Sequence, residues 1–158
     1  MAFNELFRQN LILPNVKCDT ASQLFEKVAN WLLQKNYVKS SYLTALTERE
    51  EKYPTGLSLE TINVAIPHTD CEHISYPFIA YASSEKPLFM GDMGEKNKSL
   101  EVSHYFFLGI TESKAQVELL QYLMNLFTNQ QFVQALKNAK SEKEIFQLIK
   151  NPMRSEVL

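Results

Sequence analysis

Glycine is scarce in this sequence, with only four glycines among 158 residues. Phosphate-binding loops of the P-loop and dinucleotide-binding types need clustered glycines, because the backbone must approach the phosphates closely. The sequence therefore excludes both kinds of nucleotide-binding loop. It also contains no Gly-x-Ser-x-Gly turn and no protein-kinase signature. These absences argue against a serine hydrolase of the α/β type and against an enzyme that binds ATP itself.

Cysteine is also scarce, and the two cysteines, Cys18 and Cys71, lie far apart and form no Cys-x-x-Cys motif. This usage indicates a reducing compartment. No apolar run approaches the roughly 20 residues that span a bilayer, and the first residues lack the basic-then-apolar order of a secretion signal. We therefore expect a cytoplasmic protein without membrane insertion. A net charge of −2 and the lack of a basic cluster argue against nucleic-acid binding.

The length, with 45% hydrophobic and 22% charged residues, suits one compact domain with its own core. Helices are predicted over 20–36, 40–53, 113–127, 131–139 and 141–149, where apolar residues recur at helical spacing. Capping boxes open three of them, at residues 20–23, 113–116 and 141–144, and Ser40 caps a fourth. Strands are predicted over 62–66, 77–82, 88–90 and 102–110, with an opening strand or irregular segment within 3–18. This order favours a single α/β domain over residues 1–158, with a mixed sheet sandwiched between helices.

A histidine directly follows one of the predicted strands. Val64 and Ile66 alternate with smaller residues, and Pro67 should end the strand because it has no N–H to donate. His68 comes next, at the carboxyl end of a strand, where α/β folds place ligand chemistry. An imidazole with an ordinary pKa of roughly 6.5 is largely neutral in the cytoplasm and can carry a covalent group as a nucleophile. The alternative is a histidine that merely ends a strand.

Two residues upstream of His68 have side chains suited to an anion. Arg49 carries a planar guanidinium that matches phosphate oxygens, although its run Glu48-Arg49-Glu50-Glu51 also fits a solvated helix end. Thr55 has a hydroxyl that can donate to a phosphate oxygen, although a turn residue behind Pro54 is the simpler explanation. Each residue alone leaves both interpretations open.

A cluster of metal-capable residues opens a different hypothesis. His68, Asp70, Cys71 and His73 form a His-x-Asp-Cys-x-His pattern. Structural zinc, however, usually takes four ligands in paired spacings, and no second pair is present. A zinc-binding module through His68, Cys71 and His73 is therefore an alternative, and no metal is assigned to the main hypothesis.

Two motifs together resemble a known family. The first is Arg49-Glu50 followed by Tyr53-Pro54-Thr55-Gly56-Leu57, and the second is Val64-Ala65-Ile66-Pro67-His68-Thr69. They resemble the enzyme IIA component of the sugar phosphotransferase system, of the mannitol–fructose type (enzyme IIA type 2). The resemblance extends over nearly the whole chain, because the helix order on both sides of the motifs also fits.

This resemblance implies a phosphotransferase component with a phosphohistidine intermediate. His68 would accept a phosphoryl group from the phosphocarrier protein HPr and pass it to a cysteine of the cognate IIB component, while the IIC channel moves the sugar. Arg49 would supply cationic stabilisation, Thr55 would complete the phosphate cradle, and no cofactor, metal or nucleotide would take part. The alternative within this family is a regulatory protein whose phosphorylation state controls a partner.

One position departs from many members of the family. They carry a second histidine at the start of the helix after the last strand, where this chain has Gln116. As the third residue after Ser113, Gln116 also fits a capping box. The resemblance implies a galactitol-like subgroup, whose members also have glutamine here, and Thr69 fits that subgroup as well. A galactitol or related polyol system is the expectation, with Gln116 as a supporting residue of the site.

Overall fold

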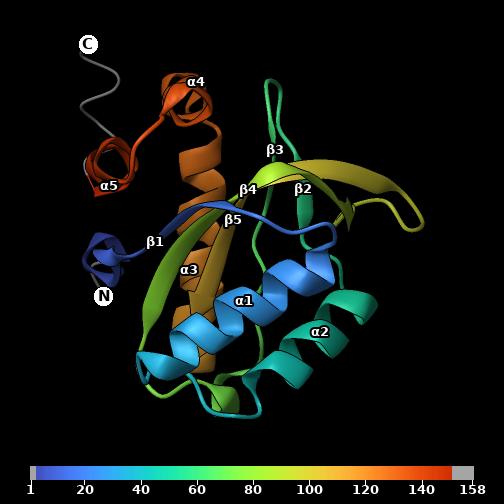
Figure 1. Cartoon of the computed structure of the whole chain (residues 1–158), viewed down its shortest axis with the longest axis vertical. Coiled ribbons are helices and arrows are strands. Elements are labelled where there is room, and N and C mark those ends of the chain that lie inside the picture. The colour runs from blue at the N-terminus through green and yellow to red at the C-terminus, as the bar shows by residue number, and fades with distance from the viewer. Residues whose placement is uncertain (1–2, 151–158) are drawn as a thin grey trace.

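The computed structural model describes residues 3–150 (Figure 1). At its centre lies a five-stranded sheet with the order β1-β4-β5-β3-β2. The strands are β1 (Phe7–Val16), β2 (Gly56–Ser58), β3 (Asn63–Ala65), β4 (Phe78–Gly91) and β5 (Ser99–Gly109). Neighbours pair in parallel in β1–β4 and β3–β5 and in antiparallel fashion in β4–β5 and β2–β3, so the predicted mixed sheet is confirmed.

Helices cover both faces of this sheet (Figure 1). They are α1 (Ala21–Gln34), α2 (Tyr42–Lys52), α3 (Ser113–Phe127), α4 (Gln130–Asn138) and α5 (Glu142–Lys150), with short 3₁₀ turns η1 (Phe3–Leu6) and η2 (Cys71–His73). One apolar core packs α1 and α2 against the sheet, and a second packs α3, α4 and α5 against the opposite face. Each fully buried Leu or Phe contributes about 1.5–3 kcal/mol. The predicted single α/β domain with a sandwiched sheet is confirmed. No helix within residues 3–150 has both the length and the apolar character that a membrane span requires.

Two predicted capping boxes are present. At the start of α1, the Thr20 hydroxyl accepts from the Gln23 backbone N–H at 3.2 Å. At the start of α5, the Ser141 hydroxyl accepts from the Glu144 N–H at 3.1 Å. Both bonds satisfy donors that the first helical turn leaves without partners.

The other two predicted caps are wrong. Ser113 is already the first residue of α3, Glu112 precedes it as the cap, and no side chain caps this helix. Because no capping box forms there, the Gln116 side chain is available for other contacts. The second helix begins at Tyr42 behind Ser41 rather than behind Ser40. The sequence offers two adjacent serines here. The Ser41 side chain does not cap the helix, and its hydroxyl bonds to His73 Nδ1 at 2.8 Å instead.

The strands predicted over 77–82 and 88–90 form one strand, β4, with a register shift between Ser83 and Leu88. The polar residues within the shift interrupt the alternation of apolar side chains, while the backbone continues to pair with β5. A bulge has this effect on the sequence pattern, because the extra residues have no opposite partner. The turn between β4 and β5 is correspondingly short, since Gly91 pairs with Ser99.

The strand that leads to His68 is shorter than predicted, but it aims the histidine as expected. β3 ends at Ala65, and the chain then continues beside β5, where the Leu108 N–H donates to the Pro67 carbonyl at 3.1 Å. Pro67 fits here because this contact uses its carbonyl and needs no N–H. His68 forms an isolated bridge with Leu108 and so lies at the carboxyl end of β3.

Candidate functional site

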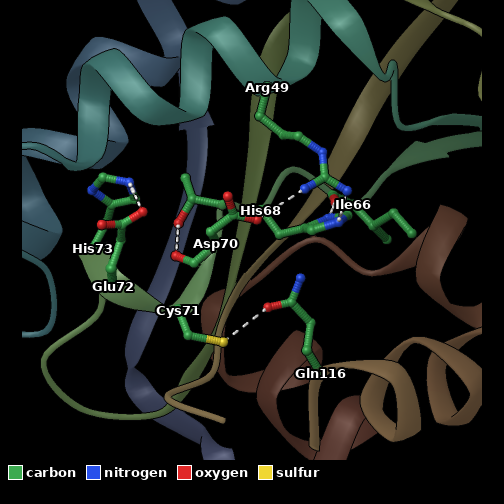
Figure 2. Close-up of polar contacts among 9 residues, drawn as sticks. Arg49, Ile66, His68, Asp70, Cys71, Glu72, His73 and Gln116 are labelled. Carbon is green, nitrogen blue, oxygen red and sulfur yellow. Dashed lines mark hydrogen bonds and ion pairs between the residues drawn. The ribbon is translucent and has the colours of Figure 1, made fainter. Parts of the chain in front are cut away.

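His68 is buried, with 5% of its surface exposed, and one hydrogen bond fixes its ring. Its Nδ1 lies 2.7 Å from the Ile66 carbonyl oxygen (Figure 2). Because a carbonyl oxygen can only accept, Nδ1 must carry the proton and donate it. The opposite nitrogen, Nε2, therefore keeps its lone pair in the neutral ring.

Arg49 faces this lone pair from the last turns of α2. Its Nη2 lies 3.5 Å from His68 Nε2, and its Nη1 lies 3.4 Å from a carboxylate oxygen of Asp70. The Asp70 side chain is 76% exposed, so this ion pair is weak and leaves the guanidinium available. The guanidinium also lies over the Tyr53 ring at 5.2 Å. Its buried Nε has no hydrogen-bond partner among the described residues.

The surroundings keep His68 neutral. Burial lowers the pKa of its imidazole below 6.5, and the Arg49 charge lowers it further. The bond to the Ile66 carbonyl and the Asp70 charge act in the opposite direction and only partly compensate. A neutral imidazole beside a cation is suited to attack an anionic group, because the guanidinium stabilises negative charge on the group transferred.

Gln116 approaches the site from the first turn of α3, opposite Arg49 (Figure 2). The Cys71 thiol donates to its side-chain oxygen, with 3.6 Å between Sγ and Oε1. Since the oxygen is engaged by Cys71, the amide nitrogen points toward His68 in Figure 2. An amide N–H₂ in this position can donate a hydrogen bond to an anion, although it supplies no positive charge.

Thr55 lies at the site but bonds away from it. It is 2% exposed, and its hydroxyl and backbone N–H both donate to the Glu50 carboxylate at 2.8 Å. Burial raises the pKa of Glu50 to about 7, although the two Thr55 bonds and the Arg49 charge lower it. A hydroxyl has one proton, so a direct bond from Thr55 to a phosphate oxygen would require exchange of its bond to Glu50.

An open cavity of about 800 Å³ gives access to these groups. Arg49, Thr55 and His68 line it, together with the turn between β4 and β5, which contributes Lys96 and Lys98. Apolar and aromatic side chains contribute to the wall, namely Tyr53, Met93 and Leu120. The cavity is large enough for an anionic group together with the side chain that delivers it.

The zinc hypothesis finds no support in the geometry. Within residues 3–150, no three His, Cys, Asp or Glu side chains come together as a metal site. His73 instead bonds through Nδ1 to the Ser41 hydroxyl at 2.8 Å, and its Nε2 lies 3.7 Å from Glu72 (Figure 2). His68 and Cys71 face Arg49 and Gln116, respectively.

Comparison with known proteins identifies the family. Residues 5–152 match the family described as "Phosphoenolpyruvate-dependent sugar phosphotransferase system, EIIA 2". The chain belongs to this family. This enzyme IIA protein is a phosphotransferase component that carries its phosphoryl group on a histidine, as the resemblance in the sequence implied.

Relatives agree with this assignment. The galactitol-specific EIIA component of Escherichia coli strain K12 is 26% identical over 115 residues, which cover 73% of this chain and 76% of the relative. The solution structure of the mannitol-specific cryptic phosphotransferase enzyme IIA CmtB from Escherichia coli has a TM-score of 0.76 at 18% identity, covering 96% of this chain and 99% of CmtB. Enzyme IIA of mannitol from Escherichia coli, in complex with phosphorylated enzyme IIB, has a TM-score of 0.70 at 17% identity, covering 89% and 94%. These two structures support the fold.

The structure brings Arg49, Thr55 and His68 together in the lining of one cavity and places Gln116 on the other side of His68 from Arg49 (Figure 2). The sequence did not predict that Glu50 holds Thr55 or that Cys71 holds Gln116. Glu50 belongs to the quoted family motif, but its place in a charged run suggested a solvated side chain. Cys71 carried no signal for contact with Gln116, which lies 45 positions away in the chain.

Proposed function

We propose that His68 is the phosphoryl acceptor of this enzyme IIA protein and that Nε2 is the atom that reacts. One observation carries the proposal: Nδ1 is committed to the Ile66 carbonyl at 2.7 Å, while Nε2 faces Arg49, and both residues line the cavity. The protein then receives its phosphoryl group from phospho-HPr and gives it to a cysteine of the cognate IIB component, in the cytoplasm. The IIC channel depends on this transfer without contacting the protein.

The reaction is a transfer between two nucleophiles. The Nε2 lone pair attacks the phosphorus held on an HPr histidine, a new N–P bond forms, and the bond to HPr breaks with its electron pair returning to the HPr ring. The His68 ring gains positive charge in this step, and the Ile66 carbonyl stabilises that charge through the Nδ1 proton. In the second step the IIB thiolate attacks phosphorus, and the N–P electron pair returns to Nε2.

The remaining side chains act on the negative charge of the phosphoryl oxygens. Arg49 supplies a cation whose Nη2 lies 3.5 Å from Nε2, and Gln116 supplies a neutral amide donor from the opposite side. Phosphoryl transfer depends mainly on positioning and on charge stabilisation, so these donors suffice without covalent help. A neutral donor in place of a second histidine also avoids excessive stabilisation of the phosphorylated protein, which would slow onward transfer.

We propose a galactitol or related polyol system as the setting. The support is the 26% identity to the galactitol-specific EIIA component and the glutamine at position 116. The test is sugar phosphorylation with membranes that contain the cognate IIB and IIC proteins. Galactitol should be phosphorylated faster than mannitol or fructose, and a preference for either of those sugars would contradict the assignment.

The acceptor role is tested by intact mass after incubation with enzyme I, HPr and phosphoenolpyruvate. Wild type should gain one phosphoryl group, and His68→Gln should gain none. A phosphorylated His68→Gln protein would overturn the assignment. Addition of the cognate IIB protein should then remove the phosphoryl group from the wild-type protein. A phosphoryl group that stays in place would favour the regulatory alternative.

A further inference from the structure

Glu50 and Thr55 join two parts of the site that are separate in the fold. Glu50 follows Arg49 on α2, and its two carboxylate oxygens accept from the backbone N–H and the hydroxyl of Thr55, both at 2.8 Å. Thr55 directly precedes β2, which forms a hairpin with β3. The helix that carries Arg49 is therefore tied to the hairpin that leads to His68.

The same connection continues to the back of the reactive ring. The Thr55 carbonyl accepts from the Ile66 N–H at 3.2 Å, and the Ile66 carbonyl accepts from His68 Nδ1 at 2.7 Å. Four hydrogen bonds thus lead from the Glu50 carboxylate to the imidazole through two residues. A shift of Thr55 would move the carbonyl of Ile66, which selects the protonated nitrogen of the ring.

The opposite side of this segment leaves little room for movement. A Cβ on Gly56 would lie only 2.4 Å from the Gly91 carbonyl oxygen, so residue 56 must be glycine for β4 to approach this closely. The Gly56 carbonyl also accepts from the Met93 N–H at 2.8 Å. The segment at 54–56 is therefore held against β4 on one side, and Glu50 is the side chain that holds it to α2 on the other.

We propose that Glu50 is a positioning residue that, through Thr55 and Ile66, fixes the ring orientation of His68 and its separation from Arg49. This inference rests on the proposed acceptor role of His68. Glu50 has no contact with the reacting atoms, because both of its oxygens are engaged by Thr55. Its contribution is to keep Nδ1 protonated and Nε2 free in the orientation that faces the guanidinium.

The first experiment measures the His68 tautomer by ¹⁵N NMR of the ring in wild type, Glu50→Ala, Glu50→Gln and the control Glu48→Ala. Glu48 is an exposed carboxylate on the same helix. Wild type and Glu48→Ala should show the Nδ1-protonated form alone, and Glu50→Ala should show a mixture of both tautomers. Glu50→Gln can accept only one of the two Thr55 bonds, so a smaller shift is expected. If a folded Glu50 variant keeps the wild-type tautomer, the proposal is overturned.

The second experiment measures transfer from phospho-HPr. Glu50→Ala should lower the rate at saturating phospho-HPr about ten- to hundredfold, because misplacement of a reacting group has effects of this size. KM should stay near the wild-type value, since both Glu50 oxygens are engaged by Thr55. Should Glu50→Ala fail to fold, Glu50→Gln decides, and a wild-type rate in that variant would overturn the proposal. The NMR measurement of the tautomer needs no phosphoryl donor, so it tests the role of Glu50 even if His68 proves not to be the phosphoryl acceptor.

Discussion

Replacement of Arg49 by glutamine tests the electrostatic part of the mechanism. The guanidinium nitrogen lies 3.5 Å from Nε2, so a phosphoryl group on that atom has the cation beside it. One unit charge at a separation of about 4 Å contributes about 4 kcal/mol at an effective dielectric constant of about 20. Removal of a single donor from a preorganised site typically slows a reaction about 10²- to 10³-fold. We expect Arg49→Gln to slow phosphoryl acceptance by this factor.

The assay is rapid-quench measurement of transfer from phospho-HPr, with phosphorylated and unphosphorylated protein separated on a phosphate-affinity gel. Arg8→Gln is the matched control, because Arg8 loses the same charge on β1, where it contacts Tyr37 instead of the site. Arg49→Lys should lie between wild type and Arg49→Gln, since it keeps the charge but loses the planar fork. If the rate of Arg49→Gln lies within about threefold of the rate of Arg8→Gln, Arg49 does not stabilise the transferred group, because a threefold ratio corresponds to less than about 1 kcal/mol.

Three further predictions concern protonation, stability and the amide of Gln116. Because burial lowers the pKa of His68, an NMR titration should give a midpoint below 6.5. The neutral ring then stabilises the folded protein above pH 6.5, and this contribution should be lost as the pH falls through the midpoint. Phosphoryl transfer should be lost over the same range. A midpoint at or above 6.5 would be inconsistent with the buried site. Tyr42→Phe should raise the free energy of unfolding in urea by about 1 kcal/mol, because the buried Tyr42 hydroxyl has no hydrogen-bond partner among the described residues. A clear decrease in the free energy of unfolding would show that this hydroxyl does make a hydrogen bond. Cys71→Ala should slow phosphoryl acceptance about fivefold by releasing the Gln116 oxygen, with Cys71→Ser near wild type; equal rates in all three proteins would exclude a role for the thiol.

Features determined by neighbouring residues were predicted well. The alternation before Pro67 placed His68 at the end of a strand, and the capping patterns at Thr20 and Ser141 located two helix starts. These signals depend on backbone geometry over a few residues, so they can be read without knowledge of the tertiary structure. The layered α/β architecture followed because the order of elements limits how a sheet can be covered.

Features that depend on contacts between distant segments were not predicted. The pattern at Ser113 matched a capping box, but Gln116 bonds to Cys71 instead. The polar residues at the β4 bulge suggested that a strand had ended, although pairing with β5 continues. Glu50 belonged to a charged run, and only the folded hairpin places Thr55 against it. The partners of Gln116 and of β4 lie far away in the sequence, so the local pattern carries no sign of these contacts.

The most direct test of the central claim is ¹⁵N and ³¹P NMR of the phosphorylated protein with labelled histidine. Phosphorus should couple to Nε2 of His68, with the Nδ1 proton still present and bonded to the Ile66 carbonyl. A phosphoryl group on Nδ1, or on any residue other than His68, would rule out the proposed acceptor, because Nδ1 is engaged by Ile66 and Nε2 faces Arg49.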